Sequence, residues 1–423
     1  MTRLRTVLLV LGLAAVTAPL AAQSTAEARE LLSDVKFLAS DALQGRKIGT
    51  PGADTAAAYL ARRFAAAGLQ PGPRGWFQRF TVSPDAPAAQ HTGIGGAEGE
   101  NVIGVLSGRD PVLQNEIVVV GAHYDHLGLG GFGSLAPDST GKVHNGADDN
   151  ASGASALVAI AHRLMAHRPA RTIVFIAFTG EEEGLLGSEW YVKHPLYPID
   201  HTVAMINLDM VGRLRNSKLI IYGTASAKEW PALLDSLNTA PKFDIRGHGD
   251  GYGPSDQSSF YAAHRPVLHL FTDLHEDYHR PTDDWQKINA DGLARVANFA
   301  AAIAQAVGDR RGELTFVDVP APVASDTTPA VTSGYGAYLG TIPDMSENPG
   351  GVGVTGVRAG SPAEKSGLRA GDVIVKMDGK EVKDLMAMTV VLRAHKAGDS
   401  IEIVALRNGA PVTTQATLGV RPD

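Results

Sequence analysis

The fold is decided by one stretch of the sequence, Asn145-Gly146-Ala147-Asp148-Asp149-Asn150-Ala151-Ser152-Gly153. An apolar run at residues 154–164 follows it directly, and this run predicts a helix with a polar start. Taken alone, the adjacent carboxylates Asp148 and Asp149 indicate a helix N-cap, because Asp commonly accepts the first free backbone N–H groups of a helix. The residues on either side of this stretch suggest a second role for these carboxylates.

Residue types that bind metals or move protons follow the strand-like runs of this chain: His123 and Asp125 after 116–120, Glu181 and Glu182 after 171–178, Asp209 after 203–208, and His279 after 266–271. Strands that alternate with helices predict an α/β fold with a largely parallel sheet covered by helices on both faces. In such sheets the carboxyl ends of the strands deliver functional side chains. We therefore expect these residues to form one site.

The spacing of His123 and Asp125 suits a metal-bound imidazole. Residues i and i+2 of an extended segment point to the same side, so the Asp125 carboxylate can accept the far ring N–H of His123 and fix its tautomer. His126 is a competing ligand that ranks lower, as a residue of the pocket wall. Adjacent Glu181 and Glu182 allow one carboxylate to bind metal while the other moves protons, although acids at this position could also form a solvated helix N-terminus.

The composition restricts the kind of site. The chain contains no cysteine, which excludes disulfides and thiolate zinc sites and leaves His, Asp and Glu as ligands. Such ligands suit a catalytic metal with an open coordination position. Removing residues 1–22, which carry two arginines and no acidic residue, changes the formal net charge from −7 to −9. This balance argues against a nucleic-acid partner and against a basic membrane-binding surface.

The first 22 residues have the layout of a signal peptide. Arg3 and Arg5 precede an apolar run at residues 7–13, and small residues lead to Ala22. We therefore expect an exported protein, periplasmic or secreted, with a retained N-terminal anchor as the less favoured alternative. No later stretch reaches the roughly 18 apolar residues that a membrane span needs, so the mature chain is expected to lack one.

Residues of about 27 to 308 resemble the co-catalytic zinc aminopeptidases of peptidase family M28. The order of His, Asp, Glu-Glu, Asp and His along the chain matches that of the family. Three sequence motifs also carry the resemblance: Gly-Ala-Asp-Asp-Asn-Ala-Ser-Gly at 146–153, Glu-Glu-Glu-Gly-Leu-Leu-Gly-Ser at 181–188 and Asn-Leu-Asp-Met at 207–210. The resemblance implies that two zinc ions are bound by His123, Asp148, Glu182, Asp209 and His279. It further implies that Asp148 bridges the ions and precedes a cis peptide bond to Asp149, and that Glu181 is the general base.

A second match, Tyr252-Gly253-Pro254-Ser255-Asp256, resembles the family segment whose tyrosine stabilises the oxyanion. Tyr252 is therefore a candidate catalytic residue, although it could equally anchor a glycine-rich loop. Gln257 stands where the family often has His. The resemblance implies removal of N-terminal residues from peptides with a free amine. The alternatives are a carboxypeptidase, a glutaminyl cyclase, an amino-acid deacylase, or a non-catalytic peptide-binding scaffold.

The composition changes after residue 310. We expect a peptidase domain at 23–310, a proline-containing linker at 311–333 and a second domain at 334–423. The words Gly-Val-Thr-Gly-Val at 353–357, Ser-Pro-Ala-Glu-Lys-Ser-Gly-Leu at 361–368 and Ala-Gly-Asp-Val-Ile at 370–374 resemble a bacterial PDZ domain, a β-rich fold with short helices. In that family the segment at 338–340 would bind a peptide C-terminus. The alternative is a PDZ domain whose groove is unused.

Overall fold

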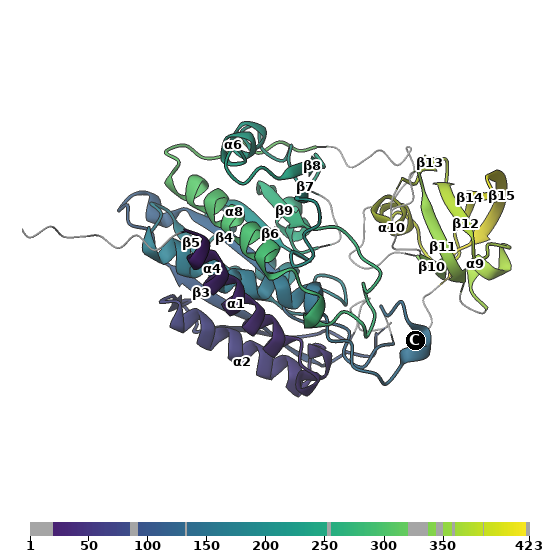
Figure 1. Ribbon diagram of the computed structural model, residues 1–423, viewed down its shortest axis with the longest axis horizontal. Helices are drawn as coiled ribbons and strands as arrows, with labels where there is room; N and C mark the ends of the chain where they lie inside the picture. The colour runs from purple at the N-terminus through teal and green to yellow at the C-terminus, as the bar shows by residue number, and fades with distance from the viewer. Residues whose placement is uncertain are drawn as a thin grey trace, which may run out of the picture.

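The computed structural model describes residues 20–84, 92–131, 133–251, 255–319, 337–343, 350–357, 360–383 and 385–419. Figure 1 shows a larger α/β unit, coloured purple to green, and a smaller β-rich unit in yellow-green. Residues 1–19 of the expected signal peptide lie outside the described residues, as does Tyr252. None of the described helices is long and apolar enough to cross a membrane.

The larger unit is built on one mixed sheet of nine strands: β1 (Gln70–Pro71), β2 (Phe77–Thr81), β3 (Glu98–Leu106), β4 (Ile117–His123), β5 (Thr172–Phe178), β6 (Thr202–Leu208), β7 (Lys218–Tyr222), β8 (Asp244–Gly247) and β9 (Val267–Phe271). The strand order is β1-β3-β5-β4-β6-β9-β7-β8, with β2 paired to β3. The four central strands β5, β4, β6 and β9 are parallel, which confirms the expected α/β class. Strands β3 and β7 join this centre in the antiparallel sense.

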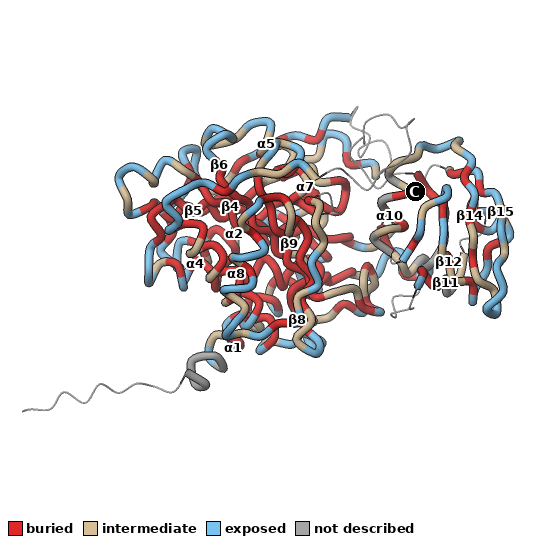
Figure 2. The backbone as a smooth tube through the Cα atoms, turned by 90° about the horizontal axis from the view of Figure 1, so that it is seen from above, coloured by how far each residue is buried: buried red, intermediate tan, exposed pale blue. Residues whose placement is uncertain are grey.

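The central strands are buried on both faces, as their continuous apolar sequences predicted. In β4, Val118 and Val120 pack into one apolar cluster, whereas Ile117 and Val119 pack into another on the opposite face. This alternation follows from the period of two along a strand. Figure 2 shows the resulting core as a continuous band of buried backbone.

Helices cover both faces of the sheet. One apolar cluster joins it to α1 (Leu20–Leu38), α2 (Pro51–Ala66), α4 (Gly153–Ala166), α6 (Trp230–Leu237) and α8 (Ala290–Asp309), and the other joins it to α5 (Leu186–Lys193) and α7 (Gln257–Ala262). Local signals set the helix starts. Thr50 accepts the N–H of Ala53 at 3.4 Å ahead of α2, and Asn289 accepts the N–H of Gly292 at 2.9 Å in α8.

Residues beyond α8 still pack on the larger unit. Phe316 forms a β-bridge with Ala227, and the N–H of Val317 donates to the carbonyl of Ser226 at 2.9 Å. Part of the segment expected to be linker therefore lies against the loop between β7 and α6, and the N–H of Val319 donates to the hydroxyl of Tyr261 in α7 at 2.7 Å. The rest of that expected linker, residues 320–333, lies outside the described residues.

The smaller unit contains a second sheet in the order β10-β11-β12-β14-β15, with β13 paired to β12. Its elements are β10 (Thr341–Pro343), β11 (Val352–Val357), α9 (Pro362–Lys365), β12 (Asp372–Met377), β13 (Lys380–Glu381), α10 (Leu385–Arg393), β14 (Ser400–Arg407) and β15 (Ala410–Thr417). Strand β10 lies at one edge of this sheet, directly after the segment at 338–340. The buried Leu339 anchors that segment, because its carbonyl accepts the N–H of Ala363 at 2.8 Å.

Candidate metal centre and active site

The candidate site lies at the carboxyl ends of the four parallel strands. His123 is the last residue of β4, Asp209 follows β6, and Glu182 lies four residues after β5. His279 belongs to the loop after β9, and Asp149 belongs to the π-helical turn Ala147–Ser152 that leads into α4. These strand ends and loops bring the side chains into contact with one another.

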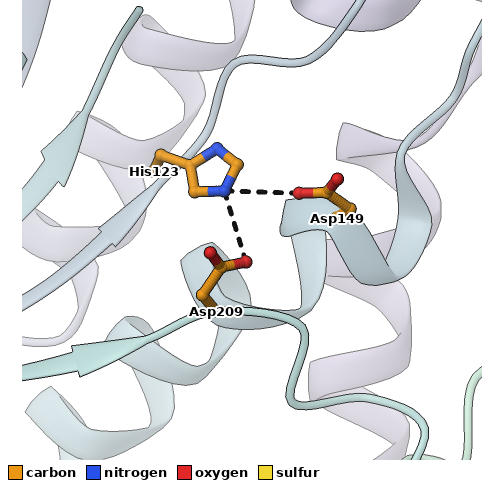
Figure 3. A group of neighbouring side chains, drawn as sticks. All are labelled: His123, Asp149 and Asp209. Carbon is orange, nitrogen blue, oxygen red and sulfur yellow. Dashed lines mark hydrogen bonds and ion pairs between the residues drawn. The ribbon is translucent and has the colours of Figure 1, made fainter. Parts of the chain in front are cut away.

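Asp149 lies between two histidines and offers one carboxylate oxygen to each. Its Oδ1 lies 3.3 Å from the Nε2 of His123, which also lies 3.3 Å from the Oδ1 of Asp209 (Figure 3). Its Oδ2 lies 3.1 Å from the Nε2 of His279, which lies 3.1 Å from the Oε2 of Glu182. A carboxylate placed in this way has the geometry of a ligand that bridges two metal ions.

The separations between these atoms suit zinc. Ligand atoms that are each about 2.1 Å from a tetrahedral zinc ion are separated by about 3.4 Å. The contacts of Asp149 with His123 and His279 are 3.3 and 3.1 Å, so small displacements would admit an ion at each position. His, Asp and Glu are also the ligand types that catalytic zinc sites use. The residues therefore fit two zinc ions.

The electrostatics of the site indicate a need for cations. Burial opposes a charged imidazole, but the carboxylates of Glu182 and Asp149 outweigh it and raise the pKa of His279 to about 10. Burial and Asp149 act to raise the pKa of Glu182, yet the imidazoles of His279 and His126 lower it to about 2. Protonated histidines thus compensate the buried carboxylates, and metal ions would replace those protons on binding.

The assignment of Asp148 as the bridging residue requires correction. Its Oδ1 accepts the N–H of Gly212 at 2.6 Å, and its Oδ2 lies 3.2 Å from the Nε2 of His275. Asp148 therefore faces away from His123 and His279, and Asp149 takes the position between them. The expected cis peptide bond at Asp148–Asp149 is also wrong, because the cis bond joins Asp149 to Asn150.

Asn150, and not Asp149, caps the first turn of the helix that follows. The Oδ1 of Asn150 accepts the N–H of Gly153 at 2.9 Å, and the side chain also donates to the carbonyl of Leu208 at 2.9 Å. This leaves both carboxylate oxygens of Asp149 to the histidines. The pair of acidic residues and the asparagine after them thus have three separate roles.

Two buried carboxylates fix the turns that carry the ligands. The Oδ2 of Asp283 accepts the backbone N–H groups of Asp148 and Asp149 at 2.9 and 3.1 Å. The two oxygens of Asp125 accept those of Glu181 and Glu182 at 3.2 and 3.4 Å. Asp283 could not be identified from the sequence, since it acts across 134 residues and belongs to no recognisable motif.

Backbone carbonyls set the tautomers of the two histidines. The Nδ1 of His123 lies 3.3 Å from the carbonyl of Asp125, whereas the Asp125 carboxylate is 3.7 Å away. Asp125 thus faces the Nδ1 of His123 with both its carbonyl and its carboxylate, and the carboxylate also accepts the N–H of Glu181. The Nδ1 of His279 donates to the carbonyl of Gly133 at 2.9 Å. In both rings Nε2 is left to face the carboxylates.

Glu181 is almost fully buried beside this centre. Burial raises its pKa well above the usual value, and the carboxylates of Glu182, Asp209 and Asp256 act in the same direction, whereas His123 acts against them. Glu181 is close to the site but does not pair with His123 or His279, as the other carboxylates do. Such a carboxylate is suited to exchange protons. Tyr252, the other catalytic candidate, lies outside the described residues.

The sequence also underestimated His126. This residue was expected in the pocket wall, but its Nδ1 lies 2.6 Å from the Oε1 of Glu182, and the imidazole is fully buried. His126, Asp149 and Glu182 form one compact group of metal-binding residue types, and His123, Asp149 and Asp209 form another. The only sequence signal for a role of His126 in the site was the His-Tyr-Asp-His motif at 123–126.

Two regions of this chain are similar to known protein families. Residues 101–304 match the family model described as peptidase family M28, and residues 337–418 match the model described as PDZ domain. The aminopeptidase YwaD of Bacillus subtilis (strain 168) is 29% identical over 238 residues, which cover 54% of this chain and 49% of that protein. The chain thus spans about half the length of this relative.

Two solved structures share the fold. A Zn-dependent exopeptidase from Parabacteroides distasonis superimposes with a TM-score of 0.54 and 19% identity, covering 67% of this chain and 98% of that chain. The glutaminyl cyclase of Porphyromonas gingivalis gives a TM-score of 0.53 at 17% identity, covering 65% of this chain and 96% of that chain. At these identities the likeness concerns the fold alone, so the chemistry has to be argued from the site.

Proposed function

We propose that this chain is an exported zinc aminopeptidase, because residues 101–304 match the model of peptidase family M28 and residues 337–418 match the PDZ domain model. It would remove N-terminal residues from peptides with a free amine. The observation that supports the proposal most strongly is the placement of Asp149, with one oxygen toward His123 and the other toward His279. Export is supported by the signal-peptide pattern of residues 1–22.

The metal-binding residues follow from the contacts. His123 and Asp209 would hold one zinc ion, His279 and Glu182 the other, and Asp149 both. When bound, the two ions supply the Lewis acidity that activates a water and the scissile carbonyl. Hydrogen bonds to the surrounding backbone keep the ligands in place before metal arrives, which limits the reorganisation that binding requires.

Glu181 would act as general base and then as general acid. It is buried, so its carboxylate is poorly solvated and takes up a proton readily. In the proposed reaction Glu181 accepts a proton from the attacking water and transfers it to the leaving amine. Its neighbour Glu182 is occupied by His279 and His126, which leaves Glu181 as the free carboxylate of the pair.

Replacement of the base tests this proposal. We expect Glu181→Gln to retain zinc and to lose at least about 100-fold in kcat on aminoacyl substrates, since general-base catalysis contributes roughly 10²–10⁴-fold. Zinc content and near-UV circular dichroism serve as the controls for folding. A Glu181→Gln variant with the wild-type rate would eliminate Glu181 as the base.

A substrate panel separates the aminopeptidase from related reactions. The fold is shared with a glutaminyl cyclase, so the panel should include N-terminal glutaminyl peptides beside aminoacyl, N-blocked and carboxyl-terminal substrates. We expect turnover only where the N-terminal amine is free and a peptide bond follows it. Efficient cleavage of N-blocked peptides would contradict the proposal, and complete inactivity with zinc bound would favour a non-catalytic scaffold.

We further propose that the PDZ domain binds the C-terminal end of long substrates. Strand β10 is an edge strand that could accept an added peptide strand, and the segment at 338–340 precedes it. Deleting residues 335–423 should then raise KM for long peptides without changing KM for a dipeptide-sized substrate. Equal effects on both substrates would instead indicate a role in stability.

A further inference from the structure

Glu182 lies between two imidazoles, one for each of its carboxylate oxygens. Its Oε2 is 3.1 Å from the Nε2 of His279, and its Oε1 is 2.6 Å from the Nδ1 of His126. The two imidazole rings meet edge to face, with centroids 5.8 Å apart. His126 could serve this site in two ways, as an additional metal ligand or as a hydrogen-bond donor to Glu182.

The distances distinguish these two roles. If His126 and Glu182 both bound one zinc ion at about 2.1 Å, a separation of 2.6 Å would compress the angle between them to roughly 75–80°, far from tetrahedral. A hydrogen bond between an imidazole N–H and a carboxylate has a typical separation of about 2.7–2.9 Å, close to the one observed. By contrast, the 3.1 Å contact of His279 fits a shared metal.

The ring of His126 is held in this orientation by its surroundings. A Cβ atom placed on Gly146 would lie 2.4 Å from the Cγ and 2.5 Å from the Cδ2 of His126, so the imidazole packs directly on this glycine. Gly146 has a φ of +55° and its carbonyl accepts a hydrogen bond from the Nη2 of Arg46 at 2.9 Å. The packing thus fixes the imidazole on one side while Glu182 occupies the other.

We propose that His126 is a positioning residue that donates its Nδ1–H to the Oε1 of Glu182 and restricts Glu182 to a one-oxygen contact with metal. The inference rests on the proposed zinc centre. If both oxygens of Glu182 bound the ion beside His279, they would fill a coordination position that a catalytic zinc keeps for water or substrate. His126 therefore keeps that position open.

Two substitutions at one position test the donor role. The side-chain amide nitrogen in His126→Asn can occupy the place of Nδ1 and donate the same hydrogen bond, whereas His126→Ala donates none. We expect His126→Asn to bind both zinc ions with dissociation constants within about threefold of wild type. His126→Ala should weaken one of the two sites by about 10–100-fold, the usual effect of removing such a partner. Competition with a chromophoric chelator measures both constants.

Cobalt(II) substitution provides a readout that is independent of activity. The intensity of its visible absorption reports coordination number, so the spectrum of His126→Asn should match wild type and that of His126→Ala should lose intensity as Glu182 becomes bidentate. Equal weakening in the two variants would identify His126 as a ligand and overturn the proposal, as would wild-type binding and spectra in both. If His126→Ala does not fold, His126→Gln, whose amide lies farther along the side chain, replaces it with the same expectation.

The outcome is separable from that of the proposed function. A wild-type protein that binds fewer than two metal ions would contradict the proposed centre itself. A wild-type protein that binds two ions, with no difference between His126→Asn and His126→Ala, would contradict only the role of His126.

Discussion

Replacing Arg46 with methionine tests whether one buried guanidinium organises the candidate site. Arg46 is fully buried, and its guanidinium donates to four backbone carbonyls, those of Leu38, Tyr124, Asn145 and Gly146. These carbonyls belong to the end of α1, the exit of β4 and the turn that leads to Asp149. A single side chain therefore connects three segments that meet only in the folded protein.

The magnitude follows from two opposing terms. Burial lowers the pKa of Arg46 to about 10 from its usual value of 12.5, which corresponds to a cost of about 3 kcal/mol for the buried charge. Hydrogen bonds from charged groups contribute about 1.5–3 kcal/mol each, so the four together contribute about 6–12 kcal/mol. Arg46→Met removes both terms and leaves the carbonyls without a donor. The difference between the two terms predicts that the free energy of unfolding falls by about 3–9 kcal/mol.

The intrinsic fluorescence of the protein is well suited to this measurement. All four tryptophans, Trp76, Trp190, Trp230 and Trp285, belong to the larger unit, so equilibrium denaturation followed by fluorescence reports that unit without the PDZ domain. The same samples can be analysed for zinc content after dialysis. Because the carbonyls of Asn145 and Gly146 lead to Asp149, the substitution should also reduce zinc retention.

Arg171→Met is the matched control. Arg171 is also buried, donates to the carboxylate of Glu116 at 2.7 Å and to the carbonyl of Val307 at 2.9 Å, and lies at the opposite end of β5 from the site. Both variants should lose stability, but only Arg46→Met should lose zinc. A loss below about 1 kcal/mol for Arg46→Met, or equal zinc retention in the two variants, would refute the reasoning.

Three further predictions follow from the contacts of the site. Asp283→Asn should weaken zinc binding by about 10–100-fold in a chelator competition, because its Oδ2 fixes two consecutive N–H groups of the ligand turn; unchanged affinity would contradict this. Asp149→Asn should lose metal, whereas Asp148→Asn should retain it. If metal analysis shows that Asp148→Asn loses metal and Asp149→Asn retains it, Asp148 is the bridging residue. Burial lowers the pKa of His144 to about 4. The unfolded chain therefore binds a proton at this imidazole before the folded chain does as the pH falls, and the free energy of unfolding should decrease by about 3 kcal/mol between pH 6.5 and 4. Urea denaturation of the metal-free protein measures this decrease. If His144→Gln shows the same dependence of stability on pH as wild type, the assignment to His144 is wrong.

The sequence predicted the parts of the fold that depend on local pattern. The β-branched runs that became β4, β5 and β6 lie in continuous apolar segments, which indicate strands buried on both faces. The elements it did not predict, such as β8 with its mostly exposed residues and the eight-residue α5, have short or weak patterns that tertiary packing completes. Residue types and their order therefore sufficed for the α/β class and for the region of the site.

The choice between Asp148 and Asp149 could not be made in the same way. Consecutive residues in an irregular turn point in different directions, and which of them faces His123 depends on the hydrogen bonds of the turn. Those bonds come from Asp283, more than 130 residues away in the chain, and from the N–H of Gly212, which takes the Asp148 carboxylate. The resemblance to a family pointed to this pair of residues, but only the three-dimensional contacts show that Asp149, and not Asp148, lies between the two histidines.

The buried charges of the candidate centre favour the binding of cations. Burial raises the pKa of Glu181 well above its usual value and that of Asp256 to about 7. It therefore favours the protonated, uncharged form of both side chains. Burial also acts to raise the pKa of Asp149, but the contacts with His123 and His279 hold that pKa well below its usual value. Two divalent ions would supply positive charge at this point and would thereby lower the pKa of Glu181. Metal binding and the ionisation of the proposed base are therefore one coupled equilibrium.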